Sequence, residues 1–284
     1  MSALLAAVAA VCFGSALVTT RLGLRSLDAR SGAAISIPTA ASLLVIASPV
    51  LFDAADFAPA AAVVFAAVGF FYPAFATLLR FRSTDLLGPT ITSTVSSTVP
   101  FFALASAAVW LDESIPARAV VATSGVIAGI SLLSYKASGL RPSWRGWWLA
   151  IPLAATMIGG IAQTVIKAAL FGWPSPYAAA LIGYAASCAT VFAINALPRL
   201  NRPGRSGIAV FWFACTGAVN GAGVLSLYAA LNAGPVATVA PIVAAYPLIT
   251  LLLSAAVLRD EPINLRVVAG ASLTVASVGY LVAT

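Results

Sequence analysis

Residues 235–258 read PVATVAPIVAAYPLITLLLSAAVL, and none of these 24 side chains carries a charge. About 20 mainly apolar residues are enough for a helix to cross the hydrocarbon core of a bilayer. Nine further runs, each of 19 to 26 residues, are similarly apolar, and three of them contain one basic residue each. The sequence therefore predicts ten membrane spans, over residues 2–20, 32–52, 58–79, 86–111, 117–135, 146–170, 177–197, 207–231, 235–258 and 265–283.

The composition of the 284-residue chain also indicates a membrane protein. Hydrophobic residues make up 61% of it and charged residues 8%, whereas an ordinary soluble domain carries roughly 25% charged residues. This balance excludes a soluble enzyme and, with only 3 Cys, a secreted disulfide scaffold. The net charge of +7 does not indicate nucleic-acid binding, because the basic residues are spread between the apolar runs. Since the runs lack the alternation of a membrane β-barrel, we expect an all-α integral membrane protein.

The distribution of Lys and Arg predicts how the chain is oriented. Thirteen of the 15 basic residues fall in the odd-numbered connections between the predicted spans, if Arg266 at the start of the last span is counted with the connection before it, and only Arg118 and Lys167 fall elsewhere. Basic residues are enriched in the cytoplasmic loops of membrane proteins. We therefore expect the odd-numbered connections in the cytoplasm and both chain termini on the outer side.

The sequence repeats itself once, at a shift of 146 to 148 residues. LDESI at residues 111–115 aligns with RDEPI at residues 259–263, and an Arg stands three residues after each segment. This match predicts two repeats, 1–140 and 141–284, with five helices each. Because five is an odd number, the second repeat enters the membrane upside down relative to the first, which permits alternating access to a central site. Further aligned pairs are Gly88-Pro89 with Gly234-Pro235, Pro100 with Pro247, Tyr72 with Asn220, and Arg21 with Lys167.

These features together resemble the EamA domain: a Phe13-Gly14-Ser15 start, a Gly-Pro pair that opens the fourth helix, an inner proline, and an acidic pair followed by Arg. Over nearly its whole length the chain is similar to the ten-helix members of the drug/metabolite transporter superfamily, which carry two such domains. The resemblance implies a helical basket around a central cavity, which moves small metabolites such as amino acids across a bacterial inner membrane. The sequence departs in one respect, because ten-helix members are often described with cytoplasmic termini. The partners we expect are a small-molecule substrate and the lipid bilayer, for a monomer or a homodimer.

The sharpest candidates for a substrate site are Tyr72 and Asn220, which occupy equivalent positions in the two repeats. Each is followed by a residue that can interrupt a helix, Pro73 and Gly221 respectively. Interrupted helices at matching positions of inverted repeats often mark the substrate site of a transporter. We therefore predict that Tyr72 and Asn220 bind substrate and that Pro73 and Gly221 act as hinges. Hydrogen bonds between helices would also explain the polar pair.

Hydroxyl residues concentrate in the fourth predicted span, ahead of Pro100. Thr92 and Ser96 share one helix face, one turn before this proline. In the second repeat, the aligned Pro247 follows Tyr246. We predict that Thr92, Ser96 and Tyr246 bind substrate and that the two prolines form gates. A bend that serves only helix packing is the alternative.

Gln163 and Lys167 form an i, i+4 pair in the sixth predicted span. Lys167 is the only cation well inside a predicted span, since Arg118 and Arg266 are each the second residue of theirs, and it could pair with a substrate carboxylate. Alternatively, its apolar stem lets the ammonium reach the membrane surface. Ser15 lies in the corresponding part of the first span. We include Ser15, Gln163 and Lys167 among the predicted substrate-binding residues.

Acidic residues and His are missing from the predicted spans. All eight Asp and Glu fall in connections or at helix ends, His is absent, and the three Cys lie in different runs. The sequence therefore predicts no metal site, no cofactor and no enzyme activity. Proton-coupled carriers commonly place an acid or a His inside the membrane, so we expect a facilitator or exchanger of neutral or zwitterionic metabolites, with an uncharged cavity. The alternatives are a carrier of an anionic metabolite or lipid-linked head group, a proton-coupled exporter, and a channel or non-transporting partner.

The acidic pairs Asp112-Glu113 and Asp260-Glu261 come just before the fifth and tenth predicted spans. Acids near a helix N-terminus offset its partial positive charge. We therefore expect these four residues to have a structural role at the start of those helices.

Overall fold

The computed structural model describes residues 1–52, 57–134, 146–196, 206–257 and 265–283. Within these ranges the chain forms twelve α-helices and one 3₁₀ helix, η1, and no strand occurs among them, which confirms the predicted all-α class. The elements are α1 (Ser2–Gly23), α2 (Ala29–Leu51), α3 (Pro59–Phe71), α4 (Ala74–Ser96), α5 (Val99–Trp110), α6 (Ala117–Ser134), η1 (Gly146–Leu149), α7 (Ala150–Gly172), α8 (Pro176–Ala196), α9 (Gly207–Ala233), α10 (Val236–Val243), α11 (Tyr246–Val257) and α12 (Leu265–Ala283).

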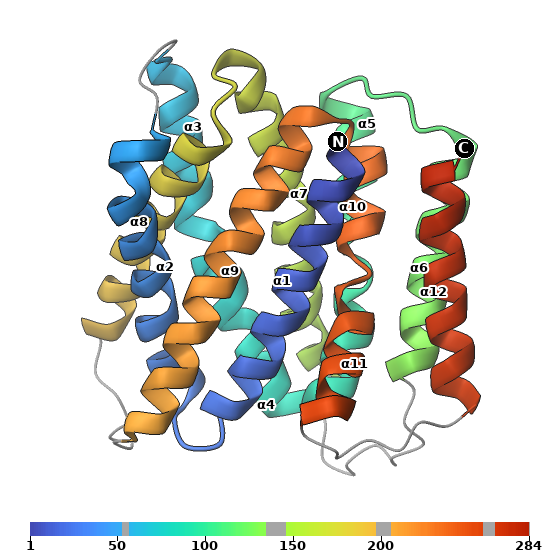
Figure 1. Cartoon of the computed structure of the whole chain (residues 1–284), viewed down its shortest axis with the longest axis horizontal. Coiled ribbons are helices and arrows are strands. Elements are labelled where there is room, and N and C mark those ends of the chain that lie inside the picture. Colours follow the sequence, from blue (N-terminus) through green and yellow to red (C-terminus); the bar gives the residue numbers. More distant parts are fainter. Residues whose placement is uncertain (53–56, 135–145, 197–205, 258–264, 284) are drawn as a thin grey trace.

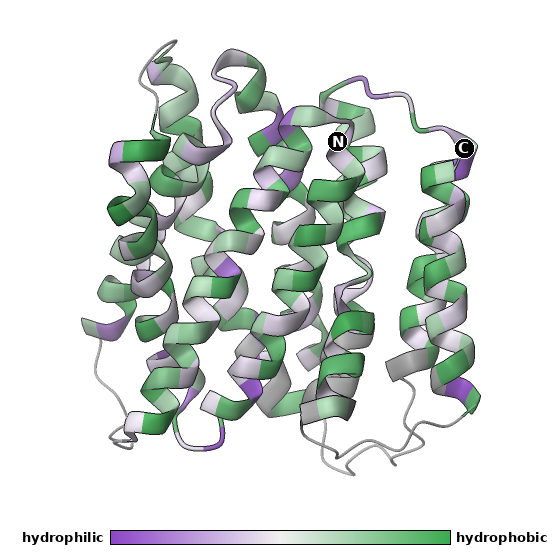
Figure 2. Ribbon diagram, viewed as in Figure 1, coloured by the Kyte–Doolittle hydropathy of each residue, from purple (hydrophilic) through white to green (hydrophobic). Residues whose placement is uncertain are grey.

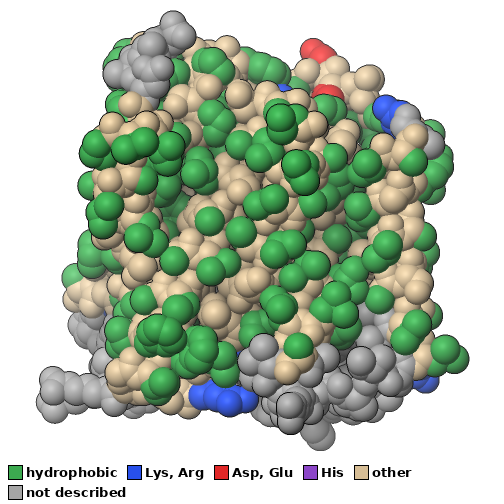
Figure 3. All heavy atoms as spheres, viewed as in Figure 1, with side chains coloured by type: hydrophobic (Ala, Val, Ile, Leu, Met, Phe, Trp, Pro, Cys, Tyr) green, Lys and Arg blue, Asp and Glu red, His purple; other side chains and the backbone are tan. Residues whose placement is uncertain are grey.

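Seven segments of the described chain are long and apolar enough to cross a membrane, and three shorter apolar helices accompany them. Hydrophobic residues dominate the helices along most of their length (Figure 2). Apolar side chains also cover the middle of the molecular face in Figure 3, where charged side chains are seen only toward the upper and lower ends. The chain is therefore an integral membrane protein. The seven segments are Ser2–Gly23, Ala29–Leu51, Pro59–Arg80, Trp147–Gly172, Pro176–Ala196, Gly207–Ala233 and Val236–Ser254.

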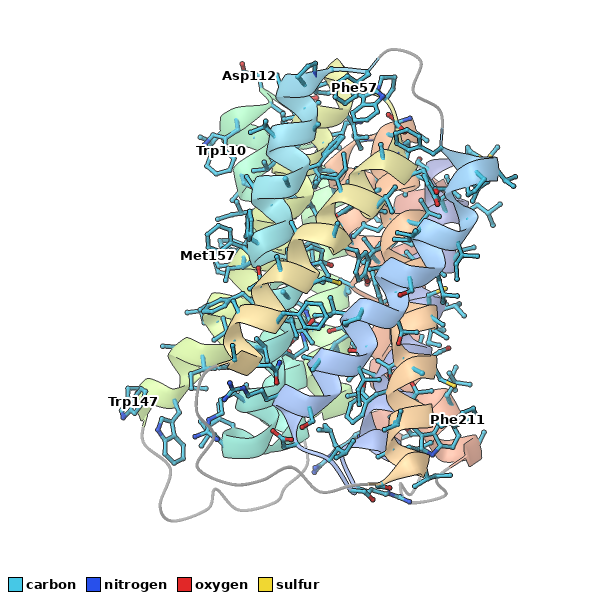
Figure 4. The ribbon with its side chains drawn as sticks, turned by 90° about the vertical axis from the view of Figure 1, so that its left-hand side faces the viewer. Phe57, Trp110, Asp112, Trp147, Met157 and Phe211 are labelled. Carbon is cyan, nitrogen blue, oxygen red and sulfur yellow. The ribbon has the colours of Figure 1, made fainter. Side chains whose placement is uncertain are left out.

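Exposed aromatic side chains lie near both ends of the helices. Figure 4 shows Phe57 and Trp110 toward one end, Trp147 and Phe211 toward the other, and Met157 between them. More than half of each of these four aromatic side chains is exposed. Aromatic residues, Trp above all, are enriched where a membrane protein meets the membrane–water interface. The two levels therefore fit the two surfaces of a bilayer.

The helices run up and down through the bundle, and the start of α1 and the end of α12 lie at the same end of the molecule (Figure 1). α1 runs away from this end and α7 runs toward it; α2 and α8 also point in opposite directions, as do α6 and α12. α1 packs against α9, α2 packs against α8 and α9, and α6 packs mainly against α12. The first and second halves of the chain are therefore interleaved rather than separate.

Helix α4 differs from the sequence prediction. We expected a connection between spans at Arg80 and Arg82, but α4 continues from Ala74 through both arginines to Ser96. A charge ends an apolar run without ending a helix, because Arg has a high helix propensity and neither Gly nor Pro stands between residues 74 and 87. Arg80 is consequently part of the helical bundle.

Three breaks divide the predicted spans. α3 ends before the cis Tyr72-Pro73 bond, α4 ends before Ser97-Thr98, and α10 ends before Ala244-Ala245. Pro100 and Pro247 therefore lie in the first turn of α5 and α11, not in the middle of a helix as the sequence suggested. Pro is favoured there because the first N–H groups of a helix have no acceptor within it.

The interruption that we expected after Asn220 is not observed, since α9 runs unbroken through Gly221. A single Gly weakens a helix by roughly 1 kcal/mol but does not have to end it. Gly221 instead lets α2 approach, because a Cβ built on it would lie 3.1 Å from the Cβ of Ala40. Its role as a hinge stays a prediction.

Other glycines bring helix backbones into direct contact. A Cβ added to Gly217 of α9 would lie 2.2 Å from the carbonyl oxygen of Ser36 in α2, and one added to Gly69 of α3 would lie 2.4 Å from that of Gly183 in α8. Small residues are common at such contacts, because attraction between membrane helices depends on close packing. These two contacts fix α9 against α2 and α3 against α8.

Candidate functional site

A cavity of about 90 Å³ lies among residues of α1, α2, α4, α5 and α7–α11. On this measure a single buried water needs roughly 10–15 Å³, so the cavity has room for a small solute. Most of the lining side chains are apolar or small, and the polar ones come from both halves of the chain. These polar members are Thr20, Ser36, Tyr72, Thr77, Arg80, Gln163, Tyr184, Thr216, Asn220 and Tyr246.

The cavity brings together five residues that the sequence singles out: Tyr72, Pro73, Gln163, Asn220 and Tyr246. Tyr72 and Pro73 lie in the break between α3 and α4, and Tyr246 begins α11 next to another break. Helix breaks thus place two of the three tyrosines of the lining. Whether these residues bind a substrate stays a prediction.

Asn220 is held by a tyrosine that sequence analysis missed. Its Nδ2 donates a hydrogen bond of 3.1 Å to the hydroxyl of Tyr184, which is only 1% exposed. α9 presents Asn220 and Thr216 on one face, four residues apart, and the Thr216 hydroxyl lies 2.8 Å from that of Thr19 in α1. This polar strip faces the cavity. The missed signal was a phenol inside an apolar run, which looks like a packing residue until its partner is known.

Gln163 of α7 is 5% exposed, and its Oε1 has no hydrogen-bond partner among the described residues. A buried acceptor that lacks a donor costs roughly 1–3 kcal/mol. Gly159, one turn earlier on α7, also lines the cavity, and a Cβ built on it would lie 3.8 Å from Cε2 of Tyr72. Among the described residues, Gln163 therefore offers an unpaired acceptor on the same lining as the Tyr72 ring.

Arg80 corrects the expectation of an uncharged cavity. Pro73, Ala76, Thr77 and Arg80 all line the cavity and follow the i, i+3, i+4, i+7 spacing of one helix face. Arg82, two residues further on, is exposed. Sequence reasoning missed Arg80 because it lies at the end of an apolar run, where an arginine normally marks a loop.

Six predicted site residues do not line the cavity in this conformation. Ser15 donates to the carbonyl oxygen of Val11 at 2.8 Å within its own helix, and Ser96 is buried at the end of α4. The side chain of Thr92 lies outside the described part of the chain. The roles of these residues stay predictions. The six are Ser15, Ser96, Pro100, Lys167, Gly221 and Pro247.

Lys167 is 8% exposed and serves the connection between α9 and α10. Its Nζ donates to the carbonyl oxygens of Leu231 at 2.6 Å and Gly234 at 2.9 Å, and lies 5.1 Å from the centre of the Phe171 ring. A cation suits this position, because the last carbonyl groups of a helix carry partial negative charge. In this conformation its hydrogen bonds are therefore directed to the backbone.

Glu113 does not cap the helix that follows it in sequence. Its carboxylate accepts hydrogen bonds from the backbone N–H groups of Val236 at 3.2 Å and Ala237 at 3.0 Å, at the start of α10. The sequence predicted the correct type of interaction, an acid at a helix N-terminus, but on the wrong helix. We call Glu113 and Lys167 the α9–α10 clamp, because together they hold both sides of this connection.

Within the described residues, no group of three or more His, Cys, Asp and Glu side chains could hold a metal ion. Cys12, Cys188 and Cys215 are all free thiols. The chemical groups that the cavity offers are therefore phenols, amides, hydroxyls and one guanidinium.

Comparison with known proteins agrees with this architecture. One solved crystal structure aligns over 98% of this chain and 96% of its own, with a TM-score of 0.81 at 15% identity, a likeness that concerns the fold alone. No curated protein matches the chain. A family model described as the EamA-like transporter family matches residues 1–135 and again residues 146–283. Because these two matches cover nearly the whole sequence, the chain belongs to the EamA-like transporter family, whose members are membrane transporters of the drug/metabolite transporter superfamily.

Proposed function

We propose that this protein is an alternating-access carrier of small neutral or zwitterionic metabolites, amino acids or related compounds, in a bacterial inner membrane. Transport is facilitative or by exchange. The observation that carries the proposal is the cavity itself, where Tyr72, Gln163 and Asn220 place hydrogen-bonding groups from both halves of the chain around one space.

The arrangement of helices supports ten spans in two inverted repeats. The break at Ser97-Thr98 and the break at Ala244-Ala245 are 147 residues apart, the same shift as in the sequence alignment (244 − 97 = 147). α2 packs against α8, and α6 against α12, so two helices each meet their own counterpart, as expected beside a twofold axis. The opposite directions of these pairs in Figure 1 agree with an inverted relation. Two such halves can rock against each other around a fixed site.

The lining also favours transport without proton coupling. Proton-coupled carriers commonly use an acid or a His inside the membrane, and none of the lining residues of the described cavity is Asp, Glu or His. Coupling by exchange requires only that the loaded carrier reorients faster than the empty one.

The test is solute flux through purified protein in proteoliposomes, beginning with amino acids. We expect labelled amino acid to enter faster when the vesicles are preloaded with the same compound, and we expect no accumulation from a pH gradient alone. Uphill accumulation driven only by that gradient would overturn the coupling mode, and absence of flux for every neutral or zwitterionic compound would overturn the transport proposal.

A matched pair of variants connects flux to the cavity. Asn220→Ala removes an amide from the lining, whereas Asn195→Ala removes one near the end of α8 whose Nδ2 donates to Val191 O. Flux should fall only in the first variant. An equal loss of flux in both variants would show that transport does not depend on the cavity.

A further inference from the structure

Arg80 is the one charged side chain among the described residues that line the cavity. It continues the lining face that begins at Pro73, just before α4, and a separation of seven positions corresponds to roughly 10 Å along a helix. Figure 1 shows α4 toward the end of the molecule opposite the termini. The positive charge therefore lies further along α4 than the break at Tyr72-Pro73, on the same lining face.

A guanidinium at this position is suited to an anionic group. Its planar fork of N–H donors matches the two oxygens of a carboxylate, and Arg stays charged at any physiological pH. A cation that is partly removed from water interacts more strongly with an anion than an exposed one does. Lys167, which the sequence analysis also considered for this role, donates to Leu231 O and Gly234 O.

The remaining polar groups of the lining are neutral, and Gln163 contributes an acceptor for which the described part of the chain supplies no donor. A solute with a negative group near Arg80 would therefore meet amide and phenol groups with its other polar atoms. A donor on the solute, such as an ammonium or a hydroxyl, satisfies the Oε1 of Gln163. The lining thus offers one charged group for an anion and neutral groups for the other polar atoms of a solute.

From this juxtaposition we infer that Arg80 determines specificity by binding a single carboxylate of the substrate, with a hydrogen-bond donor of the same molecule directed to Gln163. The inference rests on the transport function proposed above and narrows its substrates to monocarboxylate compounds that carry a donor. Neutral compounds that lack the carboxylate are excluded as good substrates.

The experiment uses purified wild type, Arg80→Gln, Arg80→Lys and the exposed control Arg82→Gln. Each protein is screened by thermal shift against the twenty amino acids, and every compound that stabilises the wild type is compared with its carboxamide and with its decarboxylated amine. Flux of the same compounds is then measured in proteoliposomes.

We expect the wild type to bind the acid with an affinity about tenfold or more above that for its carboxamide, because only the acid forms a charged hydrogen-bonding pair with Arg80. Arg80→Gln should remove this preference, Arg80→Lys should keep part of it, and Arg82→Gln should not change it. If Arg80→Gln does not fold, the reduced preference in Arg80→Lys decides.

Three results overturn the inference. They are equal affinity of the wild type for acid and amide, an unchanged preference in Arg80→Gln, and the same loss in Arg82→Gln. Flux of amides or amines that does not depend on Arg80 would refute this role while leaving the transport proposal intact. Absence of all flux would instead refute the transport proposal.

Discussion

Gln163 combines burial with an acceptor that lacks a donor, a combination that favours function over stability. Replacing it by Met keeps the length of the side chain and removes the unpaired oxygen. We predict that Gln163→Met raises the melting temperature of the purified protein and lowers flux at least tenfold, because an unsatisfied buried acceptor costs roughly 1–3 kcal/mol. A lower melting temperature with normal flux would show that the amide serves packing alone.

Tyr184 orients Asn220 through one hydrogen bond. Hydrogen bonds between membrane helices contribute on average only about 0.6 kcal/mol. We therefore predict that Tyr184→Phe changes the melting temperature little but weakens substrate binding several-fold, because the amide of Asn220 loses its fixed orientation. Binding is measured by thermal shift with the substrate found in the flux assay. A large loss of stability without any change in affinity would contradict this role.

At the residue scale, the sequence could identify polar groups that lie inside apolar runs. Tyr72, Gln163 and Asn220 could be identified from the sequence in this way, because membrane-buried polar groups are rare and costly. Arg80 could not be recognised as a cavity residue from the sequence, since a charged residue at the end of an apolar run is normal. Nor could the sequence show that Lys167 binds backbone carbonyls, because its partners are more than 60 residues away.

At the scale of elements, the α9–α10 clamp links two helix ends through opposite charges. Glu113→Gln keeps the hydrogen-bonding shape but removes the charge at the N-terminus of α10. We predict a loss of roughly 0.5–2 kcal/mol, seen as a melting temperature lower by a few degrees. Asp112→Asn is the matched control, because Asp112 is the neighbouring acid and is exposed. An equal effect of both substitutions would assign the loss to general charge and not to the clamp.

Helix pairing can be tested with two glycines in different surroundings. A Cβ on Gly217 meets the Ser36 carbonyl oxygen at 2.2 Å, whereas one on Gly279 in α12 meets nothing within 4 Å. We predict that Gly217→Ala costs roughly 1–3 kcal/mol through displacement of α2. Gly279→Ala should be neutral or stabilising by up to about 1 kcal/mol, because Ala favours helix. Equal melting temperatures for the two variants would contradict the observed contact.

The helices themselves follow from runs of apolar residues, and most of their bounds agree with the sequence to within a few residues. Their interruptions follow less directly. Pro73 does coincide with a break, yet Gly221 does not, because a membrane helix keeps its backbone hydrogen bonds unless a residue such as Pro removes one. Which helices pack together depends on contacts between distant segments, which no local pattern contains.

At the scale of the whole molecule, the proposed inverted repeat would account for the opposite directions of α1 and α7, of α2 and α8, and of α6 and α12. The start of α1 and the end of α12 lie at one end (Figure 1). The Lys and Arg distribution predicts that this end faces outward, whereas the family resemblance implies the opposite. The shape of the bundle is the same in either orientation, so only a measurement in the membrane can decide.

We predict that the charge distribution decides the orientation. A C-terminal alkaline phosphatase fusion expressed in a bacterium should therefore be active, and a C-terminal green fluorescent protein fusion should be dark, because the first folds only outside the cytoplasm and the second only within it. An N-terminal tag should be accessible from the same side. A fluorescent C-terminal fusion would show that both termini are cytoplasmic.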